Sequence, residues 1–266
     1  MTSGYSFHAG NLPLLVSVPH DGRSVPDDIA AQMTDVGKSL PDTDWHVARL
    51  YDFVKQLGAS MISAINSRYV VDLNRPADDA VMYEGQLATG LCPTQTFTGE
   101  DIYVDAAVKD KAERVERYWR PYHSKIAATL ERLRATHGYA LLWDAHSIAS
   151  RVPLLFDGEL PVLNIGTWDG RSCNRTIADA VVHDAADSSY DVALNARFKG
   201  GYITRHYGRP GDNVHSIQLE LAQRAYMDES TTLFDEEKAS QLRDTLATML
   251  EAFIKTAADN AVILSR

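Results

Sequence analysis

Two spacings of apolar residues alternate along the chain, a short one that predicts strands and a longer one that predicts helices. Residues 14–18 read LLVSV and stop at Pro-His-Asp-Gly, and residues 139–147 read YALLWDAHS, so two apolar runs lead to a histidine. Residues 214–221, VHSIQLEL, alternate apolar and polar positions, as a strand with two different faces does. Further strands are expected at 60–65, 69–73, 153–156, 161–165, 190–194 and 201–206.

Segments with helical spacing separate these runs. The apolar spacing in residues 41–58 predicts a helix. The aspartates at its start can cap it, and Gly58 can end it. Residues 105–136 combine helical spacing with dense i,i+4 charge pairs, and further helices are expected at 173–186 and 234–258. Residues 76–104 have neither spacing, and such a long loop is usually functional. Strands that alternate with helices predict a three-layer αβα fold with a central mixed, largely parallel sheet.

Composition limits the domain organisation and the partners. The 266 residues are 45% hydrophobic and show no break in composition, so we expect a single domain over 1–266. The formal net charge of −10 argues against nucleic acid or an anionic membrane as a partner, because either would require a basic face. The expected partner is a small molecule, and the pattern carries no signal of the oligomeric state.

The N-terminus and the cysteines bear on compartment and metal binding. The segment MTSGYSFHAG lacks the positive charge and apolar core of a signal peptide, and no apolar run reaches the ~20 residues that span a bilayer. We therefore expect a cytoplasmic protein. Cys92 and Cys173 lack the spacing of a zinc site, so any metal would be bound by histidine and carboxylate.

Two histidines are placed to meet at one edge of the predicted sheet. His20 and His146 lie at the carboxyl ends of apolar strands, where α/β folds build their sites; either histidine alone would more often be structural. Neutral imidazole binds zinc, and a catalytic zinc takes three protein ligands and one open position. Asp42 or Asp44 would supply the third ligand, and the alternative role for either is capping the next helix.

A glutamate lies in the alternating segment near the C-terminus. Its position puts Glu220 on the face opposite Leu219 and Leu221, in an otherwise apolar strand. A buried glutamate has a raised pKa, which suits a group that accepts a proton and later returns it to a leaving amine. The alternative, and the better one for this residue taken alone, is an ion pair with Arg205 or Arg209.

Several arginines could bind an anion. In VVDLNRP, Asn74 and Arg75 follow a predicted strand directly, and an arginine there can bind a carboxylate through two hydrogen bonds. Arg68, Arg205 and Arg209 are further candidate cations. Since the net charge of the chain repels anions, an anionic substrate would need such a local cluster.

Five motifs follow one another along nearly the whole chain: SVPHDGRSVP, DTDWHVARLY, SRYVVDLNRP, DAHS and GGYITRHYGRPGDNVHSIQLELAQRAYMDE. Together they resemble the N-formylglutamate amidohydrolase (N-formylglutamate deformylase) family, which acts last in one route of histidine degradation. More distantly, the order His, carboxylate, DLNR, His, Glu is similar to zinc carboxypeptidases and aspartoacylase, which implies a mixed-sheet α/β fold with one zinc. That wider group begins with HxxE, whereas Arg23 stands three residues after His20 here, so Asp42 or Asp44 is needed as the carboxylate ligand.

The resemblance implies zinc-dependent hydrolysis of N-formyl-L-glutamate, a small anionic N-acyl amino acid, to formate and L-glutamate. One Zn²⁺ per chain is expected, with another divalent metal as the alternative. A formyl group has almost no apolar surface, and burial of a methylene group stabilises a complex by only ~0.8 kcal/mol. Recognition must therefore act on the two substrate carboxylates. The roles that the resemblance implies are His20 and His146 as ligands, Glu220 as general acid/base, Arg68 at the oxyanion, and Asn74 and Arg75 as substrate binders. Two carboxylates require a second cation besides Arg75, for which we expect Arg205 or Arg209, with Asn74 and Tyr202 as neutral donors.

Two other functions remain as alternatives. One is an amidohydrolase for another N-acyl acidic amino acid, such as an N-acetyl or N-succinyl form. The other is a non-catalytic protein that binds acidic amino acids. A mere binding protein would not need His20, His146 and Glu220 together, so the residues favour an enzyme.

Overall fold

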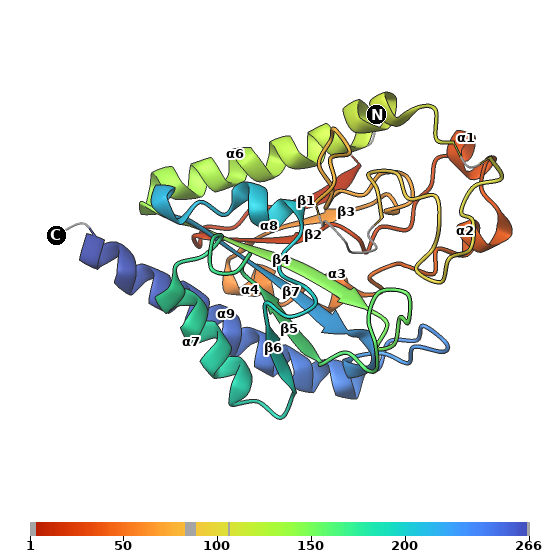
Figure 1. Ribbon diagram of the computed structural model, residues 1–266. Helices are drawn as coiled ribbons and strands as arrows, with labels where there is room; N and C mark the ends of the chain where they lie inside the picture. The colour runs from red at the N-terminus through yellow and green to blue at the C-terminus, as the bar shows by residue number, and fades with distance from the viewer. Residues whose placement is uncertain (1–3, 83–88, 106, 265–266) are drawn as a thin grey trace.

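A mixed sheet forms the middle of the computed structural model, which describes residues 4–82, 89–105 and 107–264. Within these residues the sheet has seven strands, in the order β1-β3-β2-β4-β7-β5-β6 (Figure 1). β3, β2, β4 and β7 are parallel neighbours, whereas β1 and β5 lie antiparallel at their flanks and β6 runs parallel to β5. The expected α/β class with a mixed, largely parallel sheet is thus confirmed. The strands are β1 (Tyr5–His8), β2 (Leu14–Val18), β3 (Ser60–Ala64), β4 (Ala140–Ile148), β5 (Leu163–Gly166), β6 (Val192–Leu194) and β7 (Val214–Ala222).

Helices cover both faces of the sheet and complete the three layers (Figure 1). α6 and α8 lie on one face, while α7 and α9 pack against each other on the opposite face. The helices are α1 (Asp27–Ala30), α2 (Asp35–Ser39), α3 (Val47–Leu50), α4 (Val54–Leu57), α5 (Lys111–Arg114), the π-helix η1 (Val115–Trp119), α6 (Arg120–His137), α7 (Arg175–Ala186), α8 (Tyr202–Tyr207), the 3-10 helices η2 (Pro210–Asp212) and η3 (Gln223–Ala225), and α9 (Glu236–Leu264).

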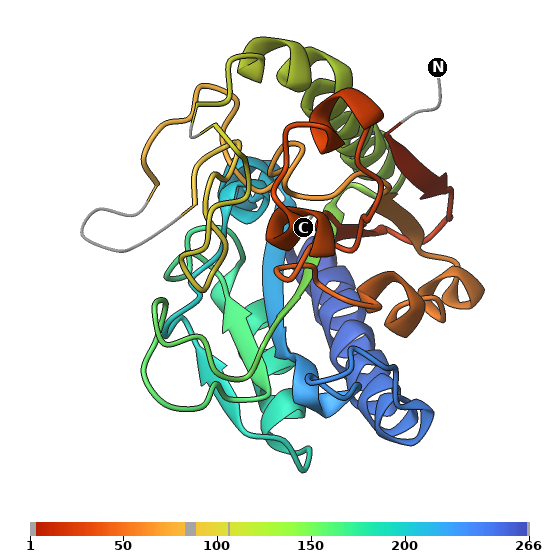
Figure 2. The same ribbon diagram turned by 90° about the vertical axis from the view of Figure 1, so that its right-hand side faces the viewer.

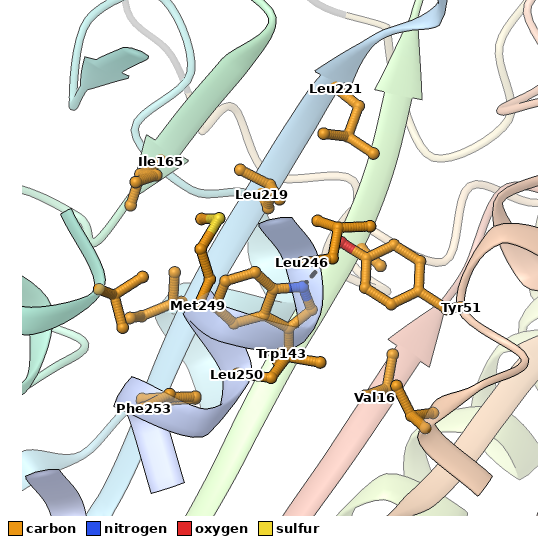
Figure 3. Packing of buried hydrophobic residues seen from close by; sticks show 14 of the residues in the cluster. Val16, Tyr51, Trp143, Ile165, Leu219, Leu221, Leu246, Met249, Leu250 and Phe253 are labelled. Carbon is orange, nitrogen blue, oxygen red and sulfur yellow. Dashed lines mark hydrogen bonds between the residues drawn. The ribbon is translucent and has the colours of Figure 1, made fainter. Parts of the chain in front are cut away.

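The larger apolar core lies between the sheet and α9, with Trp143 of β4 at its centre (Figure 3). The Trp143 indole packs against Phe253 of α9 with ring centroids 5.8 Å apart. Its Nε1 donates a hydrogen bond of 3.0 Å to the hydroxyl of Tyr51, so the buried polar atom has a partner. This packing holds β4, which carries one of the candidate histidines, against both α9 and the α3–α4 segment.

The carboxyl ends of β2, β4 and β7 lie on the right-hand side of Figure 1, which faces the viewer in Figure 2. Residues 19–46, 89–105 and 149–162 surround this edge of the sheet (Figure 2). Long connections at the carboxyl edge are where α/β proteins place their sites. No helix in the described part of the chain combines the length and apolarity needed to cross a membrane.

Two expected strands are turns in the structure, at 69–73 and 153–156. Val70 and Val71 are buried, but under neighbouring loops and helices rather than in a ladder, and the Asp72 N–H bonds the Leu91 carbonyl at 2.7 Å. An apolar run indicates burial, and it does not by itself distinguish a strand from a covered loop.

A third expected strand, 201–206, is the helix α8. Ile203 and Tyr207 are buried four positions apart, so the helical spacing of the apolar residues prevails over the β-forming composition.

The expected helix 41–58 is two short helices, α3 and α4, separated by a turn. His46 has a left-handed φ of 65°, which delays the start of α3 to Val47. The cap comes from Asp21, in the turn after β2: its carboxylate accepts hydrogen bonds from the N–H groups of His46 (3.1 Å) and Ala48 (2.9 Å). The expectation that the aspartates at 42 or 44 cap this helix is therefore wrong.

Candidate active site

Three potential metal ligands meet at the carboxyl edge of the sheet: His20, Asp44 and His146. β2 and β4 are parallel neighbours, so the histidine after β2 and the histidine in β4 face one another with ring centroids 4.8 Å apart. Asp44 lies in the loop before α3. All three side chains are buried, and one ligand atom from each lies within 4.8 Å of the others. We call these residues the metal group.

The two candidate aspartates are separated by the structure. Asp44 Oδ2 lies 3.1 Å from His146 Nδ1 and 3.7 Å from His20 Nδ1. Asp42 is turned away: its Oδ2 accepts hydrogen bonds from the Tyr69 hydroxyl (2.6 Å) and the Phe97 N–H (2.9 Å). Asp44 is therefore the aspartate that the fold brings to the two histidines.

The outer nitrogen of each histidine has a carboxylate partner. His20 Nε2 lies 2.8 Å from Asp72 Oδ1, and His146 Nε2 lies 3.0 Å from Asp144 Oδ2. Carboxylates at this position fix the ring orientation and keep the proton on the outer nitrogen of a metal-binding histidine. Both Nδ1 atoms then face Asp44.

The donor set fits a zinc ion. His20 Nδ1 is buried and has no hydrogen-bond partner among the described residues, although its ring is held firmly by Asp72. Two imidazoles and one carboxylate, with space left on one side, are the protein ligands of a common type of catalytic zinc site. A cation between the three side chains would give this nitrogen a partner.

Electrostatics keep this group ready for a cation. Burial by itself raises the pKa of Asp44, but His20 and His146 outweigh it and hold the pKa below its usual range. Asp72 is likewise buried, and His20 and Arg68 hold its pKa well below normal. Both carboxylates are therefore ionised and favour positive charge on the groups beside them. Burial lowers the pKa of His146, but Asp144 and Asp44 outweigh it and hold that pKa well above its usual value.

Glu220 lies beside the metal group on β7, paired in register with His146 of β4. Leu219 and Leu221 point into the core and Glu220 faces the cavity, as the alternation predicts. Burial raises the pKa of Glu220 to about 8, with His146 opposing the shift. Among the described residues its carboxylate has a single hydrogen-bond donor, Gln218 Nε2 at 3.5 Å, and it forms no ion pair with Arg205 or Arg209, the latter being paired with Asp212.

The cavity in front of the metal group is lined by three arginines, Arg68, Arg75 and Arg197, and by apolar residues such as Phe97 and Phe198. The guanidinium of Arg68 is paired with Asp72 at 2.9 Å and with Asp44 at 3.5 Å. The guanidinium of Arg75 donates to the carbonyl of Thr89 at 2.7 Å. A cavity with this much positive charge beside buried carboxylates can accept an anionic ligand.

Three residues expected to bind the substrate lie outside this lining: Tyr202, Arg205 and Arg209. Because α8 begins at Tyr202, Gly201 meets the cavity while the side chains of Tyr202 and Arg205 are directed elsewhere, and Arg209 follows the helix. Tyr202 stacks on His206, Arg205 donates to the carbonyls of Gly200 and Met82, and the exposed Arg209 pairs with Asp212 at 3.0 Å.

Asn74 lines the cavity, but its carboxamide is held within the protein. Oδ1 accepts the N–H of Ile203 at 2.8 Å, and Nδ2, 3.0 Å from His146 Nε2, donates to Asp144 Oδ2 at 3.5 Å.

Among the charged residues that line the cavity, Arg197 was not predicted from the sequence. It lies on the connection between β6 and α8, where the residues show neither strand nor helix spacing, and the only available signal was its place three residues before the GGYITRHYGRPG motif.

Comparison with known proteins gives consistent matches. The family model described as N-formylglutamate amidohydrolase matches residues 12–227. An N-formylglutamate deformylase of Pseudomonas putida is 46% identical over 259 residues, which is 96% of this chain and 97% of the relative. One of Pseudomonas aeruginosa is 48% identical over 257 residues, covering 94% and 95%. The crystal structure of N-formylglutamate amidohydrolase from Ralstonia eutropha JMP134 matches with a TM-score of 0.80 and 26% identity, over 94% of this chain and 97% of that one.

Proposed function

The chain belongs to the N-formylglutamate amidohydrolase family and is a hydrolase of an amide bond, and we propose that it cleaves N-formyl-L-glutamate to formate and L-glutamate at the metal group. One observation supports this most: the cavity combines two imidazoles and a carboxylate, a desolvated glutamate, and arginines for an anionic substrate. Membership of this family favours catalysis over the alternative of a non-catalytic binding protein.

His20, Asp44 and His146 would hold the metal, and zinc is the ion that this donor set favours. When bound, zinc supplies a Lewis acid that polarises the formyl carbonyl and makes a water molecule more acidic. Asp72 and Asp144, on the outer nitrogens, keep both rings directed inward.

Glu220 performs the proton transfers. Its carboxylate accepts a proton from the attacking water and then delivers that proton to the glutamate nitrogen as the C–N bond breaks. Its raised pKa, caused by burial, suits a group that must both take and give a proton near neutral pH.

Arg68 is placed to stabilise the negative charge that develops on the formyl oxygen. Its side chain is buried, and its two pairs with Asp44 and Asp72 hold the guanidinium at the wall of the cavity. A charged donor that is already in position loses little energy to reorganisation during the reaction.

Arg75 and Arg197 are the substrate clamps that we assign to the two glutamate carboxylates. Both line the cavity, and a charge-assisted hydrogen bond contributes about 1.5–3 kcal/mol. Arg197 takes the role expected for Arg205 or Arg209. Asn74, whose Oδ1 accepts the Ile203 N–H and whose Nδ2 donates to Asp144 Oδ2, contributes to the wall of the site.

The test is formate release from N-formyl-L-glutamate by the purified protein, before and after a chelator and again with zinc restored. We expect release that chelation abolishes and zinc recovers. Activity that survives complete metal removal would refute the metal requirement, and no release by the zinc-loaded protein would refute the substrate. N-acetyl- and N-succinyl-glutamate, assayed in parallel by kcat/KM, test the alternative of a larger acyl group.

A further inference from the structure

A buried chain of hydrogen bonds runs from His146 to the helix layer behind the sheet. Asp144 Oδ2 lies 3.0 Å from His146 Nε2, and Asp144 Oδ1 accepts the hydroxyl of Ser17 at 3.1 Å. The Ser17 hydroxyl in turn lies 3.1 Å from the hydroxyl of Tyr122, on α6. Ser17, Tyr122 and Asp144 are each 0% exposed, so water does not compete for these bonds.

The direction of these bonds follows from the chemistry of the groups. An ionised carboxylate only accepts hydrogen bonds, so the Ser17 hydroxyl must donate its one proton to Asp144. The hydroxyl of Tyr122 must then donate to Ser17. The hydroxyl protons of Tyr122 and Ser17 are therefore both directed toward the carboxylate of Asp144, which holds His146.

The two histidines of the metal group are supported differently. Asp72, behind His20, accepts from the Arg68 guanidinium at 2.9 Å and from the Asn74 N–H at 2.8 Å. Asp144, behind His146, has no lysine or arginine partner in the part of the chain that the structure describes. A buried carboxylate needs hydrogen bonds, and on this side neutral groups supply them: the Ser17 hydroxyl at 3.1 Å and, at 3.5 Å, Asn74 Nδ2.

We propose that Ser17 and Tyr122 are positioning residues of the metal site, which hold Asp144 so that the His146 ring presents Nδ1 to the metal. This inference rests on the proposed metal-dependent function. Loss of the outer partner of a metal-binding histidine typically weakens metal binding about 10- to 100-fold. Removal of a residue one bond further out should weaken it less.

The experiment measures Zn²⁺ affinity of the metal-free full-length protein by chelator competition, and the visible absorption spectrum of the Co²⁺-loaded protein. We expect Ser17→Ala to weaken Zn²⁺ binding about 10-fold and to change the Co²⁺ spectrum, and Tyr122→Phe to do both to a smaller extent. The double variant should be no weaker than Ser17→Ala, because the tyrosine acts only through the serine.

Tyr207→Phe is the matched control. Tyr207 is also a buried tyrosine behind the sheet, but its hydroxyl bonds the carbonyl of His123 at 3.0 Å and has no link to Asp144. Its loss should leave Zn²⁺ affinity and the Co²⁺ spectrum unchanged.

Three outcomes would overturn the inference: wild-type Zn²⁺ affinity in both single variants, additive effects in the double variant, or reduced thermal stability without a change in metal affinity. Tyr122→Phe removes a single oxygen atom, so it keeps the test decisive where Ser17→Ala does not fold. If the unaltered protein binds no Zn²⁺, the proposed metal site itself is refuted. That result differs from a failure of the roles of Ser17 and Tyr122, because it is seen before any substitution is made.

Discussion

At the scale of the residue, the site depends on which polar atoms are held by the protein and which face the cavity. Asp42 and Asp44 are two residues apart and both buried, yet one carboxylate bonds Tyr69 and Phe97 while the other faces the two histidines. Their environments therefore predict opposite effects for the same substitution.

Asp44→Asn should abolish zinc binding at equimolar zinc and formate release with it, because an amide is a poor ligand and loses the negative charge of the metal group. Asp42→Asn keeps an oxygen that can accept from the Tyr69 hydroxyl, so zinc stoichiometry should remain at wild-type level. Metal analysis of the two purified variants checks this. Equal zinc content in both would contradict the assignment of Asp44.

Arg197→Ala should lower kcat/KM for N-formyl-L-glutamate about 10- to 100-fold, mainly through KM, because one charge-assisted contact to a substrate carboxylate is lost. Arg209→Ala is the matched control, since that exposed arginine pairs with Asp212 away from the cavity. Steady-state kinetics of the two variants tests the choice. A larger effect for Arg209→Ala would restore the assignment made from the sequence.

At the scale of the element, the start of α8 shapes the wall of the site. The Gly201 N–H donates to Gln218 Oε1 at 2.7 Å, and the carboxamide of Asn74 packs directly against this glycine. α8 thus connects β7 and the segment after residue 73 at the point where both reach the cavity. The helix can approach this closely only because residue 201 has no side chain.

Gly201→Ala should disturb the site, since the added Cβ would lie 2.3 Å from Asn74 Nδ2. We expect a loss of about 1–3 kcal/mol of stability from overpacking, together with reduced zinc affinity as Asn74 is pushed toward His146. Gly211→Ala, where nothing lies within 4 Å of the added atom, should change neither. Urea denaturation and zinc titration measure both effects, and identical behaviour of the two variants would refute the packing argument.

At the scale of the whole molecule, burial of titratable groups couples folding to pH. His123 of α6 is buried behind the sheet, stacked on Trp119, with its Nε2 2.9 Å from the carbonyl of Leu73. Burial lowers the pKa of His123 to about 3, and the hydrogen bond to Leu73 only partly opposes this. Burial likewise lowers the pKa of His215 to about 4.

These lowered pKa values predict that the folded protein loses stability as the pH falls. An unfolded histidine gains its proton near pH 6.5, whereas folded His123 stays neutral until about pH 3, so stability present above pH 6.5 is lost as the pH falls through this window. Each such group contributes a slope of about 1.4 kcal/mol per pH unit. His123→Gln should therefore show a shallower decline below pH 6.5 in urea denaturation. An unchanged slope would mean that His123 is protonated in the folded state.

The amino-acid sequence by itself determined the elements with a strong period and the chemistry at their ends. The strands β2, β4 and β7 were predicted because their apolar runs are buried in the sheet, and His20, His146 and Glu220 were identified because they interrupt or end those runs. The α/β class follows from the same alternation, since each period reflects which face of an element is buried.

Only the tertiary structure decided what depends on contacts between distant segments. It separated Asp44 from Asp42, put Arg197 in the lining of the cavity and Arg205 and Arg209 outside that lining, and joined Ser17 to Tyr122 across 105 positions. Local pattern carries no information on such pairings, because they are set by strand order, loop paths and the start of α8. The spacing of residues therefore predicted which groups the site contains, and the packing of the chain determined which of them meet.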